Sequence, residues 1–526
     1  NVNVNSVGNA ATSADITTGN IRIADGGDGG QLLFTNQYRN NGNLTGDILL
    51  NGEIDAKDAL QGGKLDFDSR GGITVNGIID ASGFEVETVN GGDISLFAAG
   101  DIAVNDGAGI FSNGAISGNI ILNSGGDITL TRINNAPSIT SNSYGNESGV
   151  TGGNVDITAN SLFLRDGAAI STDVFGAADG GDININANSN IELTGNNNVD
   201  VFVSIPGLLV NDSGSQIGSD VRPGATGKAG NINLNTSRLI VSDAGTIGSF
   251  IFGNGDSGEL SIAAQDIEMI GIDATNYPVI GNIIYPQVTG NLDQVTIKTE
   301  SLIMNGASIV SLVIGNGNAG KLNLETGSLI INESLITFFV INGSGNASQL
   351  NLETGSLIIR GGVLATTSIG GDPVDLNITA ENIELMNSQS NLVPSSFITT
   401  DIDSGTTGEG GNITIKTKNL TVRDGAIIQT GTFGNGNAGN LSIVAENIEL
   451  SGTSPDGSFG TFLSAQVNSG ATGDGGDLSI ETGKLTARDG AIIQTGTFGN
   501  GNAGNLSIVA ENIELSGISS NGLFGT

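Results

Sequence analysis

Apolar residues alternate with polar ones in short bursts along much of the chain. Typical bursts lie at residues 441–443 (Leu-Ser-Ile) and 448–450 (Ile-Glu-Leu), and turns rich in Gly, Asn or Asp follow them. A period of two residues between turn-forming residues predicts short β-strands joined by tight turns. The repeating stretches lack the spacing of a helix face, so the pattern predicts an all-β fold.

The bursts belong to a long internal repeat. Residues 423–452 recur without a change at residues 488–517, which begin 65 positions later. A shorter signature, a Gly-rich turn, then Asp or Asn, then apolar-x-apolar, has its first apolar position at Ile48, Ile94, Ile128 and further sites up to Leu506. Most of these positions are 26 to 28 residues apart, and we take each as the start of one coil of a repeat protein.

Each coil is predicted to contain three strands. In one well-defined coil they cover residues 413–415, 420–422 and 426–433, with Ile428 pointing inward. Stacked coils would place equivalent residues about 4.8 Å apart and build aliphatic ladders, because aromatic residues make up only 4% of the chain. The predicted fold class is therefore an all-β, right-handed parallel β-helix (β-solenoid) of about 28 residues per coil, with loop insertions.

The rival folds are an antiparallel sandwich and a β-propeller. Propeller blades need about 40 to 50 residues, four strands and periodic aromatic motifs. This unit is near 28 residues with three strands, and the chain has no Trp. The solenoid is therefore favoured.

Three regions are predicted along the chain. Residues 1–45 form irregular early coils, residues 46–375 form coils with variable loops, and residues 376–526 form a 65-residue two-coil superrepeat. The longer coil of each pair carries nine extra residues, which lie at 453–461 in one copy and at 388–396 in the preceding one. Since the final residues run in step with residues 456–461, we expect the chain to be a piece of a longer protein.

Charge and composition exclude several functions. The net charge is −36, which opposes binding to nucleic acid or to an anionic membrane. Cys and His are absent, so thiolate or imidazole zinc sites, Cys nucleophiles and His-dependent triads are excluded. No signal-like segment opens the chain and no run of 18 apolar residues occurs, so these residues are not expected to insert into a membrane.

Three stretches resemble a known family. They are GGDISLFAAGDIAV (91–104), GGDININANSNIELTG (180–195) and GNLSIVAENIELSG (439–452), and they are similar to the repeats of filamentous-haemagglutinin-like exoproteins. The resemblance implies a long right-handed β-helix that is secreted across the outer membrane by the two-partner route and acts in adhesion, surface layers or matrix. The chain has no Asn-Pro-Asn-Gly motif of the family's secretion domain, which would then lie before residue 1.

Arginine recurs at one position of the coil, at Arg165, Arg360, Arg423 and Arg488. A catalytic residue is needed once, so repetition predicts a corner salt bridge or hydrogen bond. The alternative is a catalytic Arg of the kind found in β-helical polysaccharide lyases.

Turns of the form Asp-Gly-Gly-Asp lie at residues 25–28, 179–182 and 474–477. Their oxygen atoms could bind calcium, which is the one candidate for a cofactor. The alternative is a tight turn that uses Gly for positive φ and Asp for hydrogen bonds to the local backbone. We expect no cofactor.

Two tyrosines, Tyr277 and Tyr285, are the candidate ligand-binding residues. Each precedes a proline, and both are predicted to lie in one projecting loop, where an aromatic ring can stack on a sugar or a protein. The alternative is that the rings cover the aliphatic ends of the wall. The long loop at residues 195–216 has the same two interpretations.

The predicted function is a secreted or cell-surface structural or adhesive fibre that is not an enzyme. Its partners would be a cell-surface or matrix polysaccharide or protein, or further copies of the chain joined end to end. The alternatives are a carbohydrate-active β-helix enzyme and a purely scaffolding filament of an extracellular matrix.

Overall fold

The computed structural model describes residues 2–5, 15–23, 30–36, 46–131, 138–195, 201–205, 208–211, 214–271, 277–341, 348–369, 374–388, 396–402 and 407–526. The chain divides into two compact units, Asn1–Asn282 and Ile283–Thr526. Of the predicted loops, the one at residues 388–396 falls almost entirely outside the described residues.

Most strands of the first unit belong to two parallel sheets. The first sheet contains β1 (Val2–Asn5), β2 (Ile16–Thr18), β4 (Gln31–Thr35), β5 (Ile48–Leu50), β7 (Lys64–Ser69), β8 (Ile73–Val75), β10 (Ile94–Ala98), β11 (Ile102–Val104), β13 (Ile120–Ser124), β14 (Ile128–Thr131), β16 (Val155–Arg165), β18 (Ile183–Thr194), β22 (Ile232–Ser242) and β25 (Leu260–Ile270). The second contains β3 (Ile21–Arg22), β6 (Ile54–Asp55), β9 (Ile78–Asp80), β12 (Gly109–Phe111), β15 (Ser138–Thr140), β17 (Ala169–Ser171), β21 (Gln216–Gly218), β23 (Thr246–Gly248), β24 (Phe250–Ile251) and β26 (Val279–Ile284), which includes the unit boundary.

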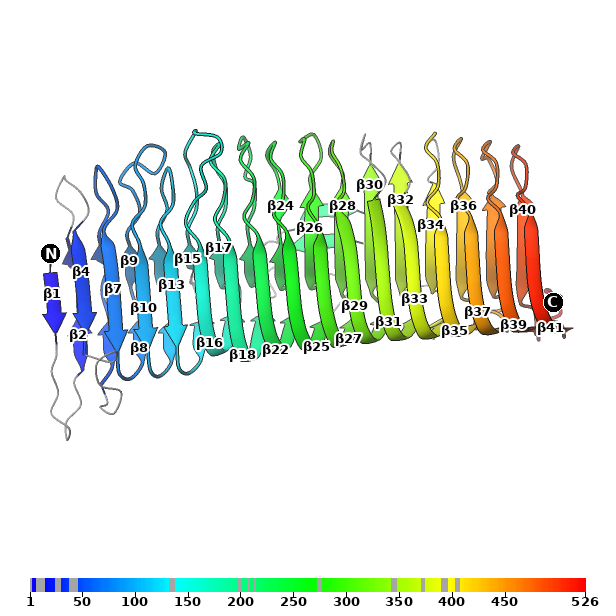
Figure 1. Cartoon of the computed structure of the whole chain (residues 1–526), viewed down its shortest axis with the longest axis horizontal. Helices are drawn as coiled ribbons and strands as arrows, with labels where there is room; N and C mark the ends of the chain where they lie inside the picture. Colours follow the sequence, from blue (N-terminus) through cyan, green and yellow to red (C-terminus); the bar gives the residue numbers. More distant parts are fainter. Residues whose placement is uncertain are drawn as a thin grey trace. The chain divides into compact units, whose positions relative to one another are not determined.

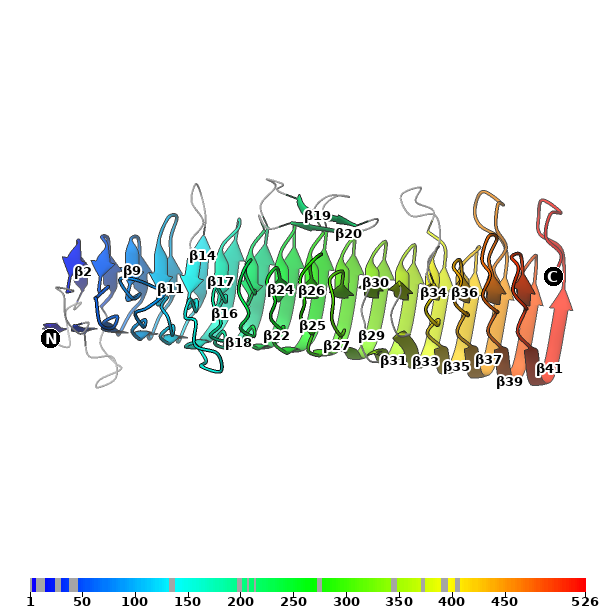
Figure 2. The same cartoon turned by 90° about the horizontal axis from the view of Figure 1, so that it is seen from above.

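The predicted loop at residues 195–216 contains an antiparallel hairpin, β19 (Val201–Ile205) and β20 (Leu208–Asn211) (Figure 2). Its role in binding a partner stays a prediction.

The second unit repeats the same two-sheet plan. Its first sheet contains β27 (Val295–Asn305), β29 (Lys321–Asn332), β31 (Ser348–Arg360), β33 (Val374–Met386), β35 (Ile413–Arg423), β37 (Leu441–Ser451), β39 (Leu478–Arg488) and β41 (Leu506–Ser516). Its second contains β28 (Ser308–Val313), β30 (Leu335–Ile341), β32 (Val363–Ile369), β34 (Phe397–Ile402), β36 (Ile427–Thr432), β38 (Phe462–Val467) and β40 (Ile492–Thr497). Figure 1 shows β29, β31, β33, β35, β37 and β39 side by side in chain order.

Equivalent residues of successive coils pair in parallel register. Leu376 pairs with Ile413, Ile413 with Leu441, and Leu441 with Leu478. In the second sheet Ile398 pairs with Ile428, and Ile428 with Leu463. The described residues form an all-β parallel β-solenoid of about 15 turns with about 29 residues per turn and no helix, which confirms the predicted fold class.

The first two predicted strands of a coil are not separate in the later coils, and this prediction was wrong there. In early coils a break at Gly100 separates β10 from β11. From β16 onward one strand of 11 or more residues runs through the corner. The Thr417 hydroxyl spans this bend by donating to the Asn419 carbonyl at 3.2 Å. Bonds of the same kind are made by Thr236, Thr299, Thr326, Thr354 and Thr482.

Two predicted coil starts were also wrong. Ile48 pairs with Ile73, and Ile128 pairs with Leu162, so both residues begin the second segment of a coil. The Gly-Asp-apolar signature does not identify the start of a coil in this part of the chain, because it precedes both the first and the second strand of an early coil, as at Ile94 and Ile102.

The interior is built from aliphatic ladders. Ile413, Ile415, Leu420 and Val422 are all buried, and Ile428 is fully buried as predicted. Glycine lines one corner because successive backbones approach too closely for a side chain. A Cβ on Gly439 would lie 2.0 Å from the Gly411 carbonyl oxygen, although neither residue has a positive φ.

The inward and outward positions predict a contrast in stability. Replacing Ile428 with Ala should lower the free energy of unfolding by about 2–5 kcal/mol, because it leaves a gap in a buried ladder. Replacing outward Thr421 with Ala should cost under about 0.5 kcal/mol. Urea denaturation of both variants measures the difference, and equal losses would contradict the register.

Candidate functional site

Two of the four recurring arginines, Arg423 and Arg488, form ion pairs at the coil corners, as predicted. Arg423 Nη2 lies 2.9 Å from Glu384 of the preceding coil, and Arg423 Nη1 lies 2.7 Å from Asp424. Arg488 pairs in the same way with Glu449 and Asp489, both at 2.8 Å. These side chains are 38% and 45% exposed, so each pair adds little stability.

The other two arginines differ. The Arg165 guanidinium lies 5.0 Å from the centre of the Phe163 ring, which is a cation–π contact. Arg360 ends β31, and no described contact defines a role for it.

The Asp-Gly pair after Arg423 makes the corner sharp and holds the inserted loop. Asp424 and Gly425 have φ of 60° and 83°, both in the left-handed region. The Gly425 N–H donates to the Thr461 hydroxyl at 3.0 Å, and that hydroxyl donates to the Ser451 carbonyl at 2.9 Å. Thr461 is the last residue of the nine-residue insertion, which lies between β37 and β38 as predicted.

The Asp-Gly turns bond from coil to coil, and the expectation of local hydrogen bonds was wrong. Asp182 Oδ1 accepts the Asn231 N–H at 2.8 Å, and Asp182 donates its own N–H to Asn154 Oδ1 at 2.9 Å. Asp477 bridges Asn440 and Asn505 in the same manner. These Asp and Asn residues, each directly before the first strand of its coil, are called the Asx ladder here. The series is interrupted in four coils, by Glu259, Gln294, Lys321 and Gln349.

The Asx ladder bears on calcium. Of the three predicted Asp-Gly-Gly-Asp turns, the one at residues 25–28 lies outside the described residues. In the other two, Asp179, Asp182, Asp474 and Asp477 all accept backbone N–H groups. Among the described residues, no group of three or more His, Cys, Asp or Glu side chains is placed to hold a metal ion. One carboxylate oxygen of each of these four aspartates therefore already has a structural use.

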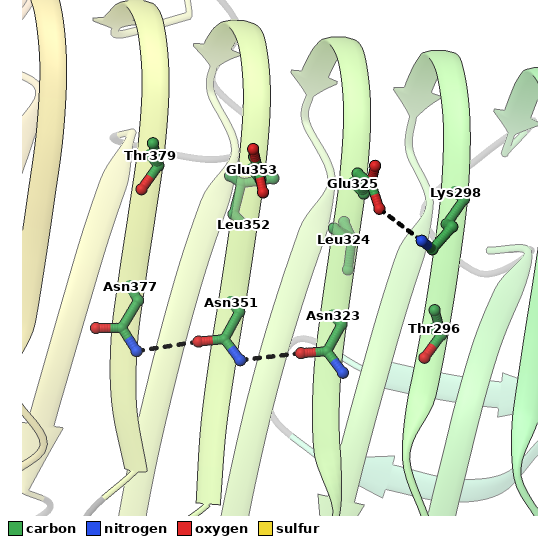
Figure 3. A pocket seen from close by; sticks show the side chains of 10 residues that line it. All are labelled: Thr296, Lys298, Asn323, Leu324, Glu325, Asn351, Leu352, Glu353, Asn377 and Thr379. Atoms are coloured by element: carbon green, nitrogen blue, oxygen red, sulfur yellow. Dashed lines mark hydrogen bonds and ion pairs between the residues drawn. The ribbon is translucent and has the colours of Figure 1, made fainter.

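A shallow groove of about 260 Å³ crosses the outer face of the first sheet in the second unit. It is lined by Thr296, Lys298, Asn323, Leu324, Glu325, Asn351, Leu352, Glu353, Asn377 and Thr379. These residues come from β27, β29, β31 and β33, and the polar ones project from the sheet side by side (Figure 3). They lie on outward positions because the residues between them, such as Leu324 and Leu352, are buried.

Three stacked amides form the floor of the groove and are called the amide ladder here. Asn351 Nδ2 donates to Asn323 Oδ1 at 2.9 Å, and Asn377 Nδ2 donates to Asn351 Oδ1 at 3.0 Å (Figure 3). Each amide has two N–H donors, so one donor of Asn351 and one of Asn377 stay available for a ligand.

Charges line one side of the groove. Lys298 Nζ lies 2.8 Å from Glu325 Oε2, and this hydrogen bond, with the charge of Glu325, raises the pKa of Lys298. Glu353 stacks on Glu325 in the next coil. The groove thus has one cation and two carboxylates beside the amide ladder, all of them able to form hydrogen bonds with a polar ligand.

A non-repeating charged cluster lies in the first unit, and sequence reasoning missed it. Arg222 Nη2 lies 2.6 Å from Asp173 Oδ2 and 3.3 Å from Asp220 Oδ2. Both carboxylates are buried, and burial raises the pKa of Asp173 against the opposing charge of Arg222. The Tyr144 and Phe175 rings stack beside it with centres 4.3 Å apart. The sequence does not reveal this cluster, because Asp173 and Asp220 are 47 positions apart and meet only in the folded coils.

The two candidate tyrosines do not lie in one loop, because β26 separates them. Tyr277 is half-buried, and Tyr285 is only 8% exposed. Burial of Tyr285 fits the alternative in which the ring covers aliphatic residues. A role of either residue in ligand binding stays a prediction.

Comparisons with known proteins identify no family. No family model, no curated protein and no solved structure matches the chain. Within the described ranges, no helix has the length and hydropathy needed to span a membrane. The fold and its repeated polar ladders place the chain in the broad class of β-solenoid repeat proteins.

The Asx ladder predicts a test that separates structure from metal binding. Asp182→Ala removes the acceptor for the Asn231 N–H and should destabilise the chain by about 1 kcal/mol. Asp182→Asn keeps an acceptor, as Asn154 does one coil earlier, and should stay within about 0.5 kcal/mol of the parent. Denaturation is measured with calcium and with a chelator. If calcium stabilises the parent chain against denaturation but stabilises neither variant, the result would contradict the structural role of Asp182.

The inserted loop predicts an unusually acidic carboxyl group. Asp456 accepts hydrogen bonds from the Ser454 and Ser458 hydroxyls and from the Ser458 N–H, which lower its pKa to about 2. The stabilisation is therefore present above the ordinary pKa of 3.8 and is lost as pH falls through about 2.

Titration of the Asp456 carboxyl carbon by NMR should give a midpoint at pH about 2. Ser454→Ala should move the midpoint upward, toward the ordinary value, because it removes the first of these donors. A midpoint near 3.8 in the parent chain would contradict the loop geometry.

Proposed function

We propose that the chain is a structural and adhesive protein of the cell surface or extracellular space, and that it has no enzymatic activity. One observation carries the proposal: the polar side chains that suggested chemistry in the sequence recur from coil to coil and bond one coil to the next. The ion pairs of Arg423 and Arg488 and the Asx ladder through Asp182 and Asp477 are the main cases.

The architecture suits this role. Within each unit, described strands of successive coils pair through backbone hydrogen bonds, so a pulling force is shared among many such bonds. The outer face offers polar side chains at a fixed spacing of about 4.8 Å. The charge of −36 keeps such a surface from binding anionic polymers indiscriminately. The resemblance to filamentous-haemagglutinin-like exoproteins supports the same role and a secreted or outer-membrane-associated location.

Adhesion under flow tests the proposal. Beads coated with the purified chain are passed over surfaces carrying bacterial matrix, host-cell layers or single polysaccharides, and the soluble fraction is assayed for new sugar ends. We expect beads with the chain to be retained more than albumin-coated beads on at least one surface, without release of sugar ends. Retention equal to albumin on every surface would contradict adhesion, and steady release of sugar ends would contradict the absence of catalysis.

Catalysis on a carbohydrate is the second candidate, and the cluster of Asp173, Asp220 and Arg222 is the observation in its favour. Paired carboxylates are the usual catalytic groups of glycoside hydrolysis. Against it, Asp173 and Asp220 are 3% and 1% exposed, and each accepts a backbone N–H, from Asp220 and Phe250 respectively. If sugar ends are released, Asp220→Asn decides the matter, because the amide keeps the acceptor for Phe250. Loss of release in this folded variant would establish the second candidate.

A further inference from the structure

We propose that the groove over β27, β29, β31 and β33 binds a neutral, extended, β-linked polysaccharide that lies across the strands. The inference rests on the proposed adhesive function and names the ligand class and the site. It is carried by the amide ladder of Asn323, Asn351 and Asn377 together with the charges beside it.

The amide ladder fixes a row of polar groups in one orientation. Asn351 donates one N–H to Asn323 and accepts one from Asn377, so its side chain cannot rotate without breaking two hydrogen bonds. The three side chains line the groove in a row at intervals of one coil (Figure 3), and each keeps a second N–H and carbonyl lone pairs for a ligand. A row of pre-oriented amides loses little conformational entropy on binding a hydroxyl-rich ligand.

The spacing selects an extended polymer. Thr296, Asn323, Asn351 and Asn377 occupy equivalent positions in four successive coils. Coils repeat about every 4.8 Å. A sugar in an extended β-1,4-linked chain advances by a similar distance, and successive sugars are turned over, so each coil meets one sugar and alternate coils meet the same sugar edge. The site should then be filled by about four sugars, one for each coil that lines the groove.

The negative charge of the groove disfavours anionic ligands. Lys298 pairs with Glu325, and both side chains are about 60% exposed. The charge of Glu353 is therefore left unbalanced, and the groove is negative on balance. Together with the net charge of −36, this arrangement disfavours a polyuronate or a sulfated glycan. A neutral chain meets no such penalty, and carboxylate oxygens accept hydrogen bonds from sugar hydroxyls. A cationic amino-sugar polymer would bind through charge alone and would lose affinity in salt.

The experiment measures affinity against chain length. The intact protein is titrated by calorimetry with β-1,4-linked glucose oligomers of two to six units, with galacturonate oligomers and with glucosamine oligomers of the same lengths, at low and high salt. We expect affinity for the neutral series to rise up to about four units and then to level off, with little effect of salt.

A matched pair of variants locates the site. Asn351→Ala removes the central rung and should weaken binding of the four-unit glucose oligomer by roughly five- to tenfold, the loss expected for one to two hydrogen bonds. Asn447→Ala removes an exposed amide hydrogen bond of the same kind, 3.0 Å to Asn419, outside the groove, and should leave binding unchanged. Circular dichroism of both variants checks that the fold is kept.

Each outcome decides between the two proposals. Stronger binding of the galacturonate or glucosamine series, no binding of the neutral series, or no dependence on length would overturn this inference. Equal loss in Asn351→Ala and Asn447→Ala would do the same and would leave the proposed adhesive function intact. Shortening of the oligomers during titration would instead contradict the proposed function, whichever variant binds.

Discussion

The structure depends on one constraint: each residue of a coil stacks in parallel register on the equivalent residue of the next coil. Backbone hydrogen bonds impose the register, and side chains must then tolerate neighbours of their own kind about 4.8 Å away. Aliphatic residues and amides tolerate this well, which is why Ile413, Leu441 and Leu478 form one ladder and Asn323, Asn351 and Asn377 another. Glycine is needed where whole backbones come together, as at Gly411 and Gly439.

Arginine stacks on uncharged residues and not on arginine in the last coils, and this gives a physical reason for the two-coil superrepeat. A unit that repeated in every coil would stack each arginine on another arginine. With a period of two coils, a coil with Glu precedes a coil with Arg, and the pairs Glu384–Arg423 and Glu449–Arg488 form. The 65-residue period is therefore a period of alternating charge as well as of loop length. The pair of Lys418 and Glu381 at 2.7 Å does not follow this period, because Gly483 stands 65 positions after Lys418.

The sequence predicted the fold well because the two-residue alternation of strands and the repeat of about 28 residues are both visible in it. Ile428 and the insertion at residues 453–461 could be placed for this reason. The continuous strand through the Thr417 corner could not be predicted, because the bend resembles a turn in sequence. The amide ladder and the Asp173–Arg222 cluster were also missed, because side chains 26 to 49 residues apart meet only once the register is known.

The register of coil on coil is the central claim, and a disulfide tests it most directly because the chain has no cysteine. Ser442 and Ser479 are outward register partners in β37 and β39, and adjacent strands lie about 4.8 Å apart, within the range a disulfide spans. Ser442→Cys with Ser479→Cys should therefore cross-link under mild oxidation with little change in stability. Ser442→Cys with Thr486→Cys, seven positions further along β39, should not cross-link. Cross-linking of the second pair in place of the first would contradict the register on which the account depends.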